Sequence, residues 1–172
     1  LANAAFGQGV AVTPIQLAQA FAAMVNGGTL VQPRVVRVVG STDTSTLARG
    51  QVLSAPVAKT LQKLMRHVVT EVDFYRDRTL IPGFEVGGKT GTAQIWDAKK
   101  GAWKINKFNY SFVGYIGREA GHPDLVVAVR IEEGTPTVVR RGLLEMPVMS
   151  FELFRRIAHN AINTPDLVPE QH

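Results

Sequence analysis

The alternation of hydrophobic and polar residues predicts two amphipathic helices in the first half of the chain. The first covers Thr13–Asn26, where Thr13 and Gln16 form a capping-box pattern and Pro14 suits the first helical turn. Its apolar stripe consists of Leu17, Phe21, Met24 and Val25. The second helix begins at Ser54, and the residues expected on its buried face are Val57, Leu61, Leu64, Val68 and Val72.

Other segments have the pattern of strands and loops. Leu30–Val39 is predicted to be extended, with Pro33 keeping it near a sheet edge, and Ser41–Gly50 to be a polar loop. Three further extended segments are expected at Phe84–Ile95, Tyr110–Gly117 and Leu125–Glu132. The residues between the last two have hairpin chemistry, which predicts antiparallel pairing.

A third amphipathic helix is expected near the end of the chain, over Pro147–Ile162. Its predicted buried residues are Phe151, Phe154, Ile157 and Ala161. The order of helix, helix, strands and helix predicts an α+β fold, an antiparallel sheet flanked by helices. We expect one folded portion over residues 1–163 and a tail over residues 164–172.

Composition then narrows the function classes. With 45% hydrophobic and 19% charged residues among 172, the chain suits a folded domain and not a disordered tail. No apolar run approaches the ~20 residues that a membrane-spanning helix needs. The absence of cysteine excludes disulfides, thiolate metal sites and a cysteine nucleophile. The formal charge of +5 is dispersed and the four histidines are scattered, so we expect no nucleic-acid partner, no metal and no cofactor.

The segment GGKTGTAQ at residues 87–94 is the most informative part of the chain. Formally, residues 83–90 satisfy GxxxxGK[ST], the pattern of a phosphate-binding loop. That pattern requires a buried strand before it and a helix directly after it. Here Pro82 closes the preceding stretch, and Gly91 and Thr92 disfavour a helix start. Nucleotide binding is therefore the weaker alternative.

The second interpretation places Lys89, Thr90 and Gly91 on an edge strand. The lysine would supply a positive charge, and the hydroxyls of Thr90 and Thr92 could bind a carboxylate or pass protons. Glycine leaves room for a substrate backbone along the strand, whose N–H groups can face a developing oxyanion. Lys-Thr-Gly occurs with S-x-x-K and S-D-N in penicillin-binding proteins and class A β-lactamases.

Four blocks around this motif resemble one such family in the family's own order. FGQGVAVTPIQLAQAFAAMVNGGTLVQPRVV, at residues 6–36, resembles its Gly-Gln-Gly turn, its Thr-Pro-x-Gln-Leu-Ala helix and its Asn-Gly-Gly stop. FEVGGKTGTAQ resembles the family's third strand, and SFVGYIG resembles the fourth. The chain thus resembles the C-terminal part of the transpeptidase domain of a class B penicillin-binding protein. The resemblance implies that it holds three of the five strands of the family's sheet.

The resemblance also implies an activity. In this family a serine attacks the D-Ala-D-Ala bond of a peptidoglycan stem peptide, and an amine resolves the acyl-enzyme; β-lactams acylate the same serine. Lys89 would then polarise the S-x-N serine, and Thr90 and Thr92 would bind the terminal carboxylate. The Thr92 N–H would form half of the oxyanion hole, and Gly91 would leave room for substrate. Gln94 and Trp96 are further candidates for substrate contact.

The family's nucleophile is missing from the sequence. The serines are Ser41, Ser45, Ser54, Ser111 and Ser150, and none begins S-x-x-K or S-x-N. We therefore expect that the family's catalytic serine lay before Leu1 and that this chain is inactive alone. The protein from which it comes is expected to be anchored in the membrane, to act outside the cytoplasm and to serve cell shape or division. The strand over Leu125–Glu132 should expose an edge where the missing N-terminal part adds its strands. A non-catalytic module that binds β-lactams or peptidoglycan is the alternative.

Two aromatic segments flank the motif. Residues 95–110 (IWDAKKGAWKINKFNY) could form a lip over the active-site groove or an irregular loop with local packing. Phe74, Tyr75 and Arg76 could line a groove, although packing is the simpler interpretation.

Overall fold

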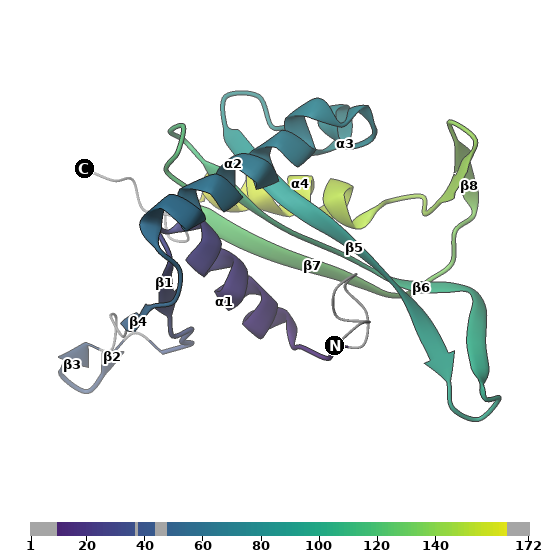
Figure 1. The fold of residues 1–172 in the computed structure, drawn as a ribbon, viewed down its shortest axis with the longest axis horizontal. Helices are drawn as coiled ribbons and strands as arrows, with labels where there is room; N and C mark the ends of the chain where they lie inside the picture. Colours follow the sequence, from purple (N-terminus) through teal and green to yellow (C-terminus); the bar gives the residue numbers. More distant parts are fainter. Residues whose placement is uncertain (1–9, 37, 44–47, 165–172) are drawn as a thin grey trace.

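A central antiparallel sheet carries helices on both faces in the computed structural model (Figure 1). The structure describes residues 10–36, 38–43 and 48–164. The helices are α1 (Pro14–Val25), α2 (Ala55–Glu71), α3 (Asp73–Thr79) and α4 (Ser150–Ile162). The strands are β1 (Thr29–Val31), β2 (Val38–Val39), β3 (Thr42–Asp43), β4 (Ala48–Gln51), β5 (Glu85–Asp97), β6 (Ala102–Gly117), β7 (Leu125–Gly134), β8 (Val138–Arg140) and β9 (Leu143–Glu145). The predicted α+β class is confirmed.

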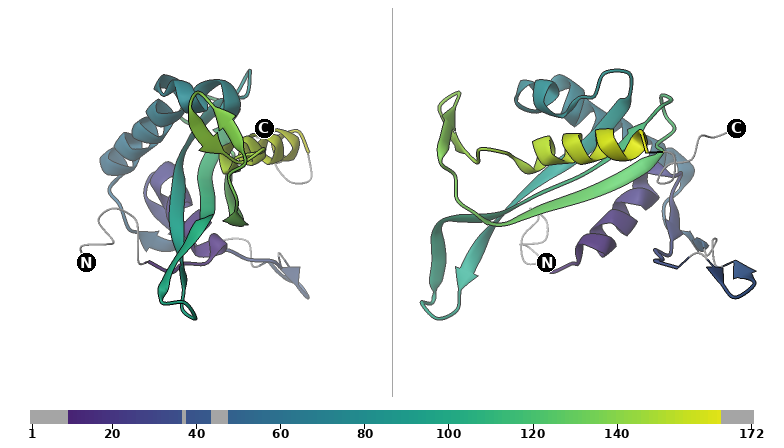
Figure 2. Two further views of the ribbon diagram at one scale, coloured as in Figure 1. Left: turned by 90° about the vertical axis from the view of Figure 1, so that its right-hand side faces the viewer. Right: turned by 180° about the vertical axis from the view of Figure 1, so that it is seen from behind.

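The main sheet has the order β5-β6-β7 and is covered on both sides. Figures 1 and 2 show α1 and α2 on one face and α4 on the other. Beneath α1, the side chains of Phe21, Val113 and Tyr115 form one buried cluster. Beneath α4, a larger cluster contains Phe112 and Phe154, whose ring centroids lie 4.8 Å apart. The sheet is therefore a fixed platform between two apolar cores.

Both outer strands of this sheet have an open edge in the part of the chain that the structure describes. There β5 pairs with β6 alone, and so does β7. The edge of β7 is the one at which the sequence predicts the addition of further strands. Within the same residues, no helix is long and apolar enough to cross a membrane.

The start of α1 confirms the capping prediction. The Gln16 backbone N–H donates to Thr13 Oγ1 over 3.3 Å, and the Thr13 N–H donates to Gln16 Oε1 over 2.9 Å. Pro14 occupies the first turn, and Asn26 ends the helix. Gly28 follows with a φ of +98°, and a side chain there would collide with the backbone of Leu53. Glycine thus lets the chain turn closely against the segment that leads into α2.

The prediction for Leu30–Val39 is only partly right. The segment contains β1 and β2, but residues 32–36 between them belong to no strand. Pro33 has no N–H to donate to a ladder, and the Val35 side chain is fully exposed. The loop predicted at Ser41–Gly50 contains β3 and most of β4, and β4 pairs antiparallel with β1. Polar residues enter a strand here because a distant partner pairs with them.

The buried faces of two helices match the prediction only in part. On α2, Ala58 and Val69 are buried, whereas Val57 and Leu64 are about half exposed. Val72 lies just beyond the helix and is also exposed; Leu61 and Val68 are half-buried. On α4, which begins at Ser150 and not at Pro147, Ile157 is exposed and Ala161 half-buried. The buried positions of α4 are Ser150, Phe151, Phe154, Ala158 and Ile162, so Phe151 and Phe154 confirm the prediction. Each helix also buries an alanine, Ala58 on α2 and Ala158 on α4, which the apolar pattern does not reveal.

Three further elements differ from expectation. Residues 95–110 do not form an irregular loop, because β5 and β6 continue as a hairpin that projects from the sheet, with a shift of register between Gln94 and Trp96 (Figure 1). The interpretation of this segment as a lip over the groove stays a prediction. The helix α3 and the small antiparallel hairpin β8–β9 were not expected. The predicted Gly-Gln-Gly turn and residues 165–172 of the predicted tail lie outside the described residues.

Candidate active site

The Lys-Thr-Gly motif lies in the middle of the edge strand β5. Residues 85–97 form one continuous strand, so Lys89 is neither in a loop nor followed by a helix. A phosphate-binding loop requires both, so the nucleotide interpretation is wrong. The interpretation of the motif as part of an edge strand is confirmed by the pairing of β5 with β6 alone among described residues.

Alternation along β5 sends neighbouring side chains to opposite faces. Lys89 lies opposite Val113, on the α1 side, and Thr90 lies opposite Phe112, on the α4 side. The exposed Lys89 Nζ nevertheless reaches its neighbour, donating to the Thr90 carbonyl over 3.0 Å and to Thr90 Oγ1 over 3.4 Å. The structure thus brings an ammonium group and a half-buried hydroxyl together at the open edge.

Tyr75 adds a second hydroxyl to this pair. Its phenol oxygen lies 3.1 Å from Thr90 Oγ1. Tyr75 belongs to α3, the helix that precedes β5 in the sequence. Local packing was the simpler interpretation of this residue in the sequence. The signal that could have found α3 is its charge pattern, with Asp73 in the first turn and Arg76 and Arg78 in the last, which suits the helix dipole.

A groove of about 610 Å³ runs beside the motif on the α1 side of the sheet. Its polar lining includes Thr13, Thr92, Asn109, Ser111 and Arg130, and it is also lined by Gly91. Ser111 Oγ donates to the Gly91 carbonyl over 3.4 Å. A Cβ atom at position 91 would lie 2.6 Å from Ser111 Oγ. A side chain at position 91 would therefore displace the Ser111 hydroxyl from this contact. Asn109, Ser111 and Arg130 carry no signal in the sequence that marks them as groove residues, because strand register alone brings them there.

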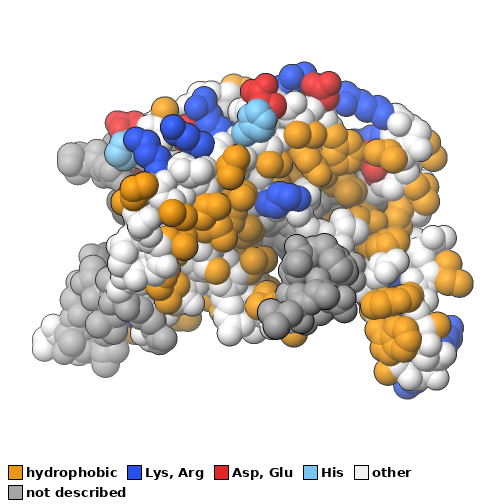
Figure 3. All heavy atoms as spheres, viewed as in Figure 1, with side chains coloured by type: hydrophobic (Ala, Val, Ile, Leu, Met, Phe, Trp, Pro, Cys, Tyr) orange, Lys and Arg blue, Asp and Glu red, His pale blue; other side chains and the backbone are white. Residues whose placement is uncertain are grey.

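Gln94 and Trp96 are not gathered with the motif. Both side chains are exposed, and Trp96 lies four residues beyond Thr92, about 13 Å along an extended strand. Trp96 instead pairs with Trp103 across the hairpin, at a ring-centroid distance of 5.2 Å. Figure 3 shows hydrophobic side chains on this projecting hairpin, with Lys or Arg side chains beside them.

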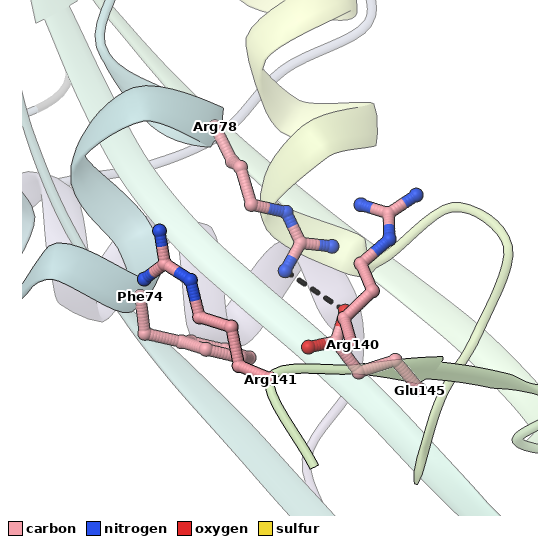
Figure 4. A pocket seen from close by; sticks show the side chains of 5 residues that line it. All are labelled: Phe74, Arg78, Arg140, Arg141 and Glu145. Carbon is pink, nitrogen blue, oxygen red and sulfur yellow. Dashed lines mark ion pairs between the residues drawn. The ribbon is translucent and has the colours of Figure 1, made fainter. Parts of the chain in front are cut away.

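The helix α3 is held by a cluster of charges around Arg78. Figure 4 shows Arg78 pointing towards Glu145, with Phe74 and Arg141 lining the same pocket of about 350 Å³. Arg78 Nη1 lies 2.8 Å from Glu145 Oε2, and Arg78 Nη2 lies 3.0 Å from Glu152 Oε2. The guanidinium also lies 5.3 Å from the Phe74 ring centroid. These contacts join α3 to β9 and to α4.

The Glu152 carboxyl belongs to this cluster and titrates below its ordinary range. Burial favours the neutral form, but hydrogen bonds from Arg78 and the Met149 N–H, with the charges of Arg78 and Arg140, lower the pKa overall. A carboxyl whose pKa is lower in the folded than in the unfolded state stabilises the fold above the unfolded pKa. That stabilisation is lost as the pH falls through the folded pKa.

We predict that Glu152→Gln lowers the free energy of unfolding by about 2 kcal/mol at pH 7, because charge-assisted hydrogen bonds are lost. The difference from wild type should shrink as the pH falls below the ordinary carboxyl pKa of about 4.3 and through the lowered pKa of the folded Glu152 carboxyl. Urea unfolding across this range measures it. Glu71→Gln, at an exposed position at the end of α2, is the control. A difference that does not change with pH would contradict the assignment.

No group of three metal-ligating side chains occurs among residues 10–36, 38–43 and 48–164. The groups that the strand and its neighbours offer for chemistry are Lys89, the hydroxyls of Thr90, Thr92 and Tyr75, and backbone N–H groups of an open strand.

Comparison with known proteins identifies similar chains. A family model described as "Penicillin binding protein transpeptidase domain" matches residues 1–144. Stage V sporulation protein D of Bacillus subtilis (strain 168) is 37% identical over 155 residues, which are 86% of this chain and 23% of that protein. The peptidoglycan D,D-transpeptidase FtsI homolog of Mesostigma viride is 27% identical over 144 residues, 74% of this chain and 24% of that protein. The chain thus spans about a quarter of either relative.

The fold agrees with solved structures. The crystal structure of penicillin binding protein 3 from Mycobacterium tuberculosis in its apo form superposes with a TM-score of 0.75 at 24% identity. The match covers 99% of this chain and 39% of that one. The same protein has also been solved in complex with aztreonam.

Proposed function

Because the chain belongs to the penicillin binding protein transpeptidase domain family, we propose that it supplies the Lys-Thr-Gly wall of a serine D,D-transpeptidase that cross-links peptidoglycan stem peptides. The observation that carries the proposal is the open edge of β5, where Lys89 Nζ and Thr90 Oγ1 lie 3.4 Å apart. An extended peptide can add to such an edge by backbone hydrogen bonds.

The residues of β5 then have distinct tasks. The Lys89 ammonium attracts the terminal carboxylate of the D-Ala-D-Ala stem, and the hydroxyls of Thr90 and Thr92 donate hydrogen bonds to it. The serine attacks the penultimate carbonyl, with the Thr92 N–H as half of the oxyanion hole; the D-Ala–D-Ala amide bond then breaks, and the terminal D-Ala leaves as an amine that takes up the serine's proton. Gly91 keeps the strand free of a side chain where the stem peptide passes. An amine from a neighbouring stem then resolves the acyl-enzyme and closes the cross-link. Gln94 is proposed to contact substrate further along the strand, with Trp96 beyond it.

The nucleophile is proposed to come from residues outside this chain, because none of its serines begins S-x-x-K or S-x-N. The open edge of β7 is where further strands would join the sheet. In this proposal the intact protein is anchored to the cytoplasmic membrane and acts on its outer face, where the wall is built. A β-lactam takes the place of the stem peptide, as the aztreonam complex of the Mycobacterium tuberculosis relative suggests.

Labelling with a fluorescent penicillin tests the proposal. We expect no stoichiometric acylation of the 172-residue chain, and saturable acylation of the full-length gene product that also contains S-x-x-K. Stoichiometric acylation of the short chain would overturn the assignment of the nucleophile. If the full-length product binds penicillin reversibly but forms no covalent adduct, the chain belongs to a non-catalytic sensor of β-lactams or peptidoglycan, and transpeptidation is excluded.

A further inference from the structure

Tyr75 contacts the Lys-Thr-Gly strand from outside the sheet. Its ring packs edge-on against Phe74 and Phe151, with centroid distances of 5.1 and 5.3 Å. Packing alone would be satisfied by a phenylalanine. The phenol oxygen, however, reaches Thr90 Oγ1 at 3.1 Å, within hydrogen-bond distance. The hydroxyl of Tyr75 therefore has a contact of its own at the candidate site.

The hydrogen-bonding capacity of Thr90 gives this contact a direction. A threonine hydroxyl has one hydrogen to donate and two lone pairs that accept. Lys89 Nζ is 3.4 Å from the same oxygen, and an ammonium group can only donate. If Tyr75 also donates, both lone pairs of Thr90 Oγ1 are occupied. The hydrogen of Thr90 is then the one left to bind an acceptor from outside.

We propose that Tyr75 is a positioning residue that donates to Thr90 Oγ1 and so presents the Thr90 O–H to the carboxylate of a stem peptide or a β-lactam. The inference rests on the proposed function, and it assigns the task to a residue of α3 that lies outside the Lys-Thr-Gly motif. A hydroxyl fixed before binding loses less entropy when it forms its bond with the carboxylate.

The geometry requires that α3 itself be held firmly. A helix of seven residues has little stability of its own. Arg78 ties its last turn to Glu145 and Glu152, and the guanidinium lies 4.7 Å from the Phe151 ring centroid. Phe151 is also the ring against which Tyr75 packs. The cluster in Figure 4 therefore supports the helix that places the phenol.

The experiment compares two ligands of the full-length gene product, benzylpenicillin and its methyl ester, which lacks the charged carboxylate. Tyr75→Phe should lower the second-order acylation rate by the free acid about three- to tenfold, the effect of one hydrogen bond, and leave the rate with the ester nearly unchanged. Tyr110→Phe is the matched control, because Tyr110 is buried in the same sheet and its hydroxyl makes no hydrogen bond with any of the described residues.

The other outcomes each decide the question. Equal losses with both ligands would show a merely structural role and overturn the proposal, and so would a Tyr75→Phe variant that reacts like wild type. If wild type is not acylated at all, the proposed function fails separately. The Thr90 methyl resonance of the full-length product then tests Tyr75: a shift in Tyr75→Phe but not in Tyr110→Phe supports positioning, and an unmoved resonance overturns it.

Discussion

Replacing Lys89 with methionine is expected to slow acylation of the full-length gene product by a fluorescent penicillin at least about 100-fold. Losing one preorganised donor at a site of developing charge typically costs two to three orders of magnitude in rate. Lys89 Nζ is also a donor to Thr90 Oγ1, so its removal takes away the charge and releases the neighbouring hydroxyl. Methionine keeps most of the aliphatic length, which limits the change to the ammonium group.

Lys99→Met is the matched control for this variant. Lys99 is exposed and lies beyond the end of β5, in the turn of the projecting hairpin. It should react within about twofold of wild type, because a solvated lysine far from the reacting atoms contributes little. A Lys89→Met variant that keeps more than a tenth of wild-type reactivity would argue against the role proposed for Lys89.

Replacing Arg78 with methionine is expected to lower the free energy of unfolding by about 3–5 kcal/mol, the usual result of leaving a buried charge unpaired. Glu145 is only 3% exposed, and Arg78 is the one cationic partner of its carboxylate in the described part of the chain. The ion pair with Arg78 is therefore what offsets the burial of Glu145. Urea unfolding of the 172-residue chain, followed by far-UV circular dichroism, measures the loss.

Arg76→Met supplies the control, because Arg76 lies on the same helix with 44% of its side chain exposed and pairs with Asp73 at the surface. We expect a loss below about 1 kcal/mol there. The double variant Arg78→Met/Glu145→Leu should be more stable than Arg78→Met alone, since it removes the stranded carboxylate. If Arg78→Met and Arg76→Met prove equally stable, the cluster does not hold α3.

Elements that are stabilised by residues close together in the sequence could be predicted from the sequence. The capping box of Thr13 and Gln16 and the stop at Asn26 involve residues close in sequence, so α1 was predicted nearly to the residue. The strands β5 and β7 and the second half of β6 were predicted as extended segments, whereas the first half of β6 was not. The Lys-Thr-Gly motif could be placed on an edge strand because the residues on both sides of it exclude a loop followed by a helix.

Features that depend on distant contacts could not be predicted in this way. Which face of α2 is buried depends on the elements that pack against it, and the exposed Val57 is as apolar in the sequence as the buried Val69. Ser111 lies beside Gly91 only through strand register. Tyr75 reaches Thr90 only because Arg78 fixes α3 to two carboxylates that follow more than 60 residues later.

The hairpin of β5 and β6 has a spectroscopic consequence. Trp96 and Trp103 are the two tryptophans of the chain, and both lie on this hairpin, half exposed and in edge contact. Intrinsic fluorescence excited at the indole band therefore reports the hairpin and not the cores under α1 and α4. The coupled indoles should add an exciton feature to the ultraviolet dichroism that disappears when either is replaced by phenylalanine. A ligand that quenches or shifts the tryptophan emission would thereby be shown to bind beyond the end of the Lys-Thr-Gly segment, without any label being attached.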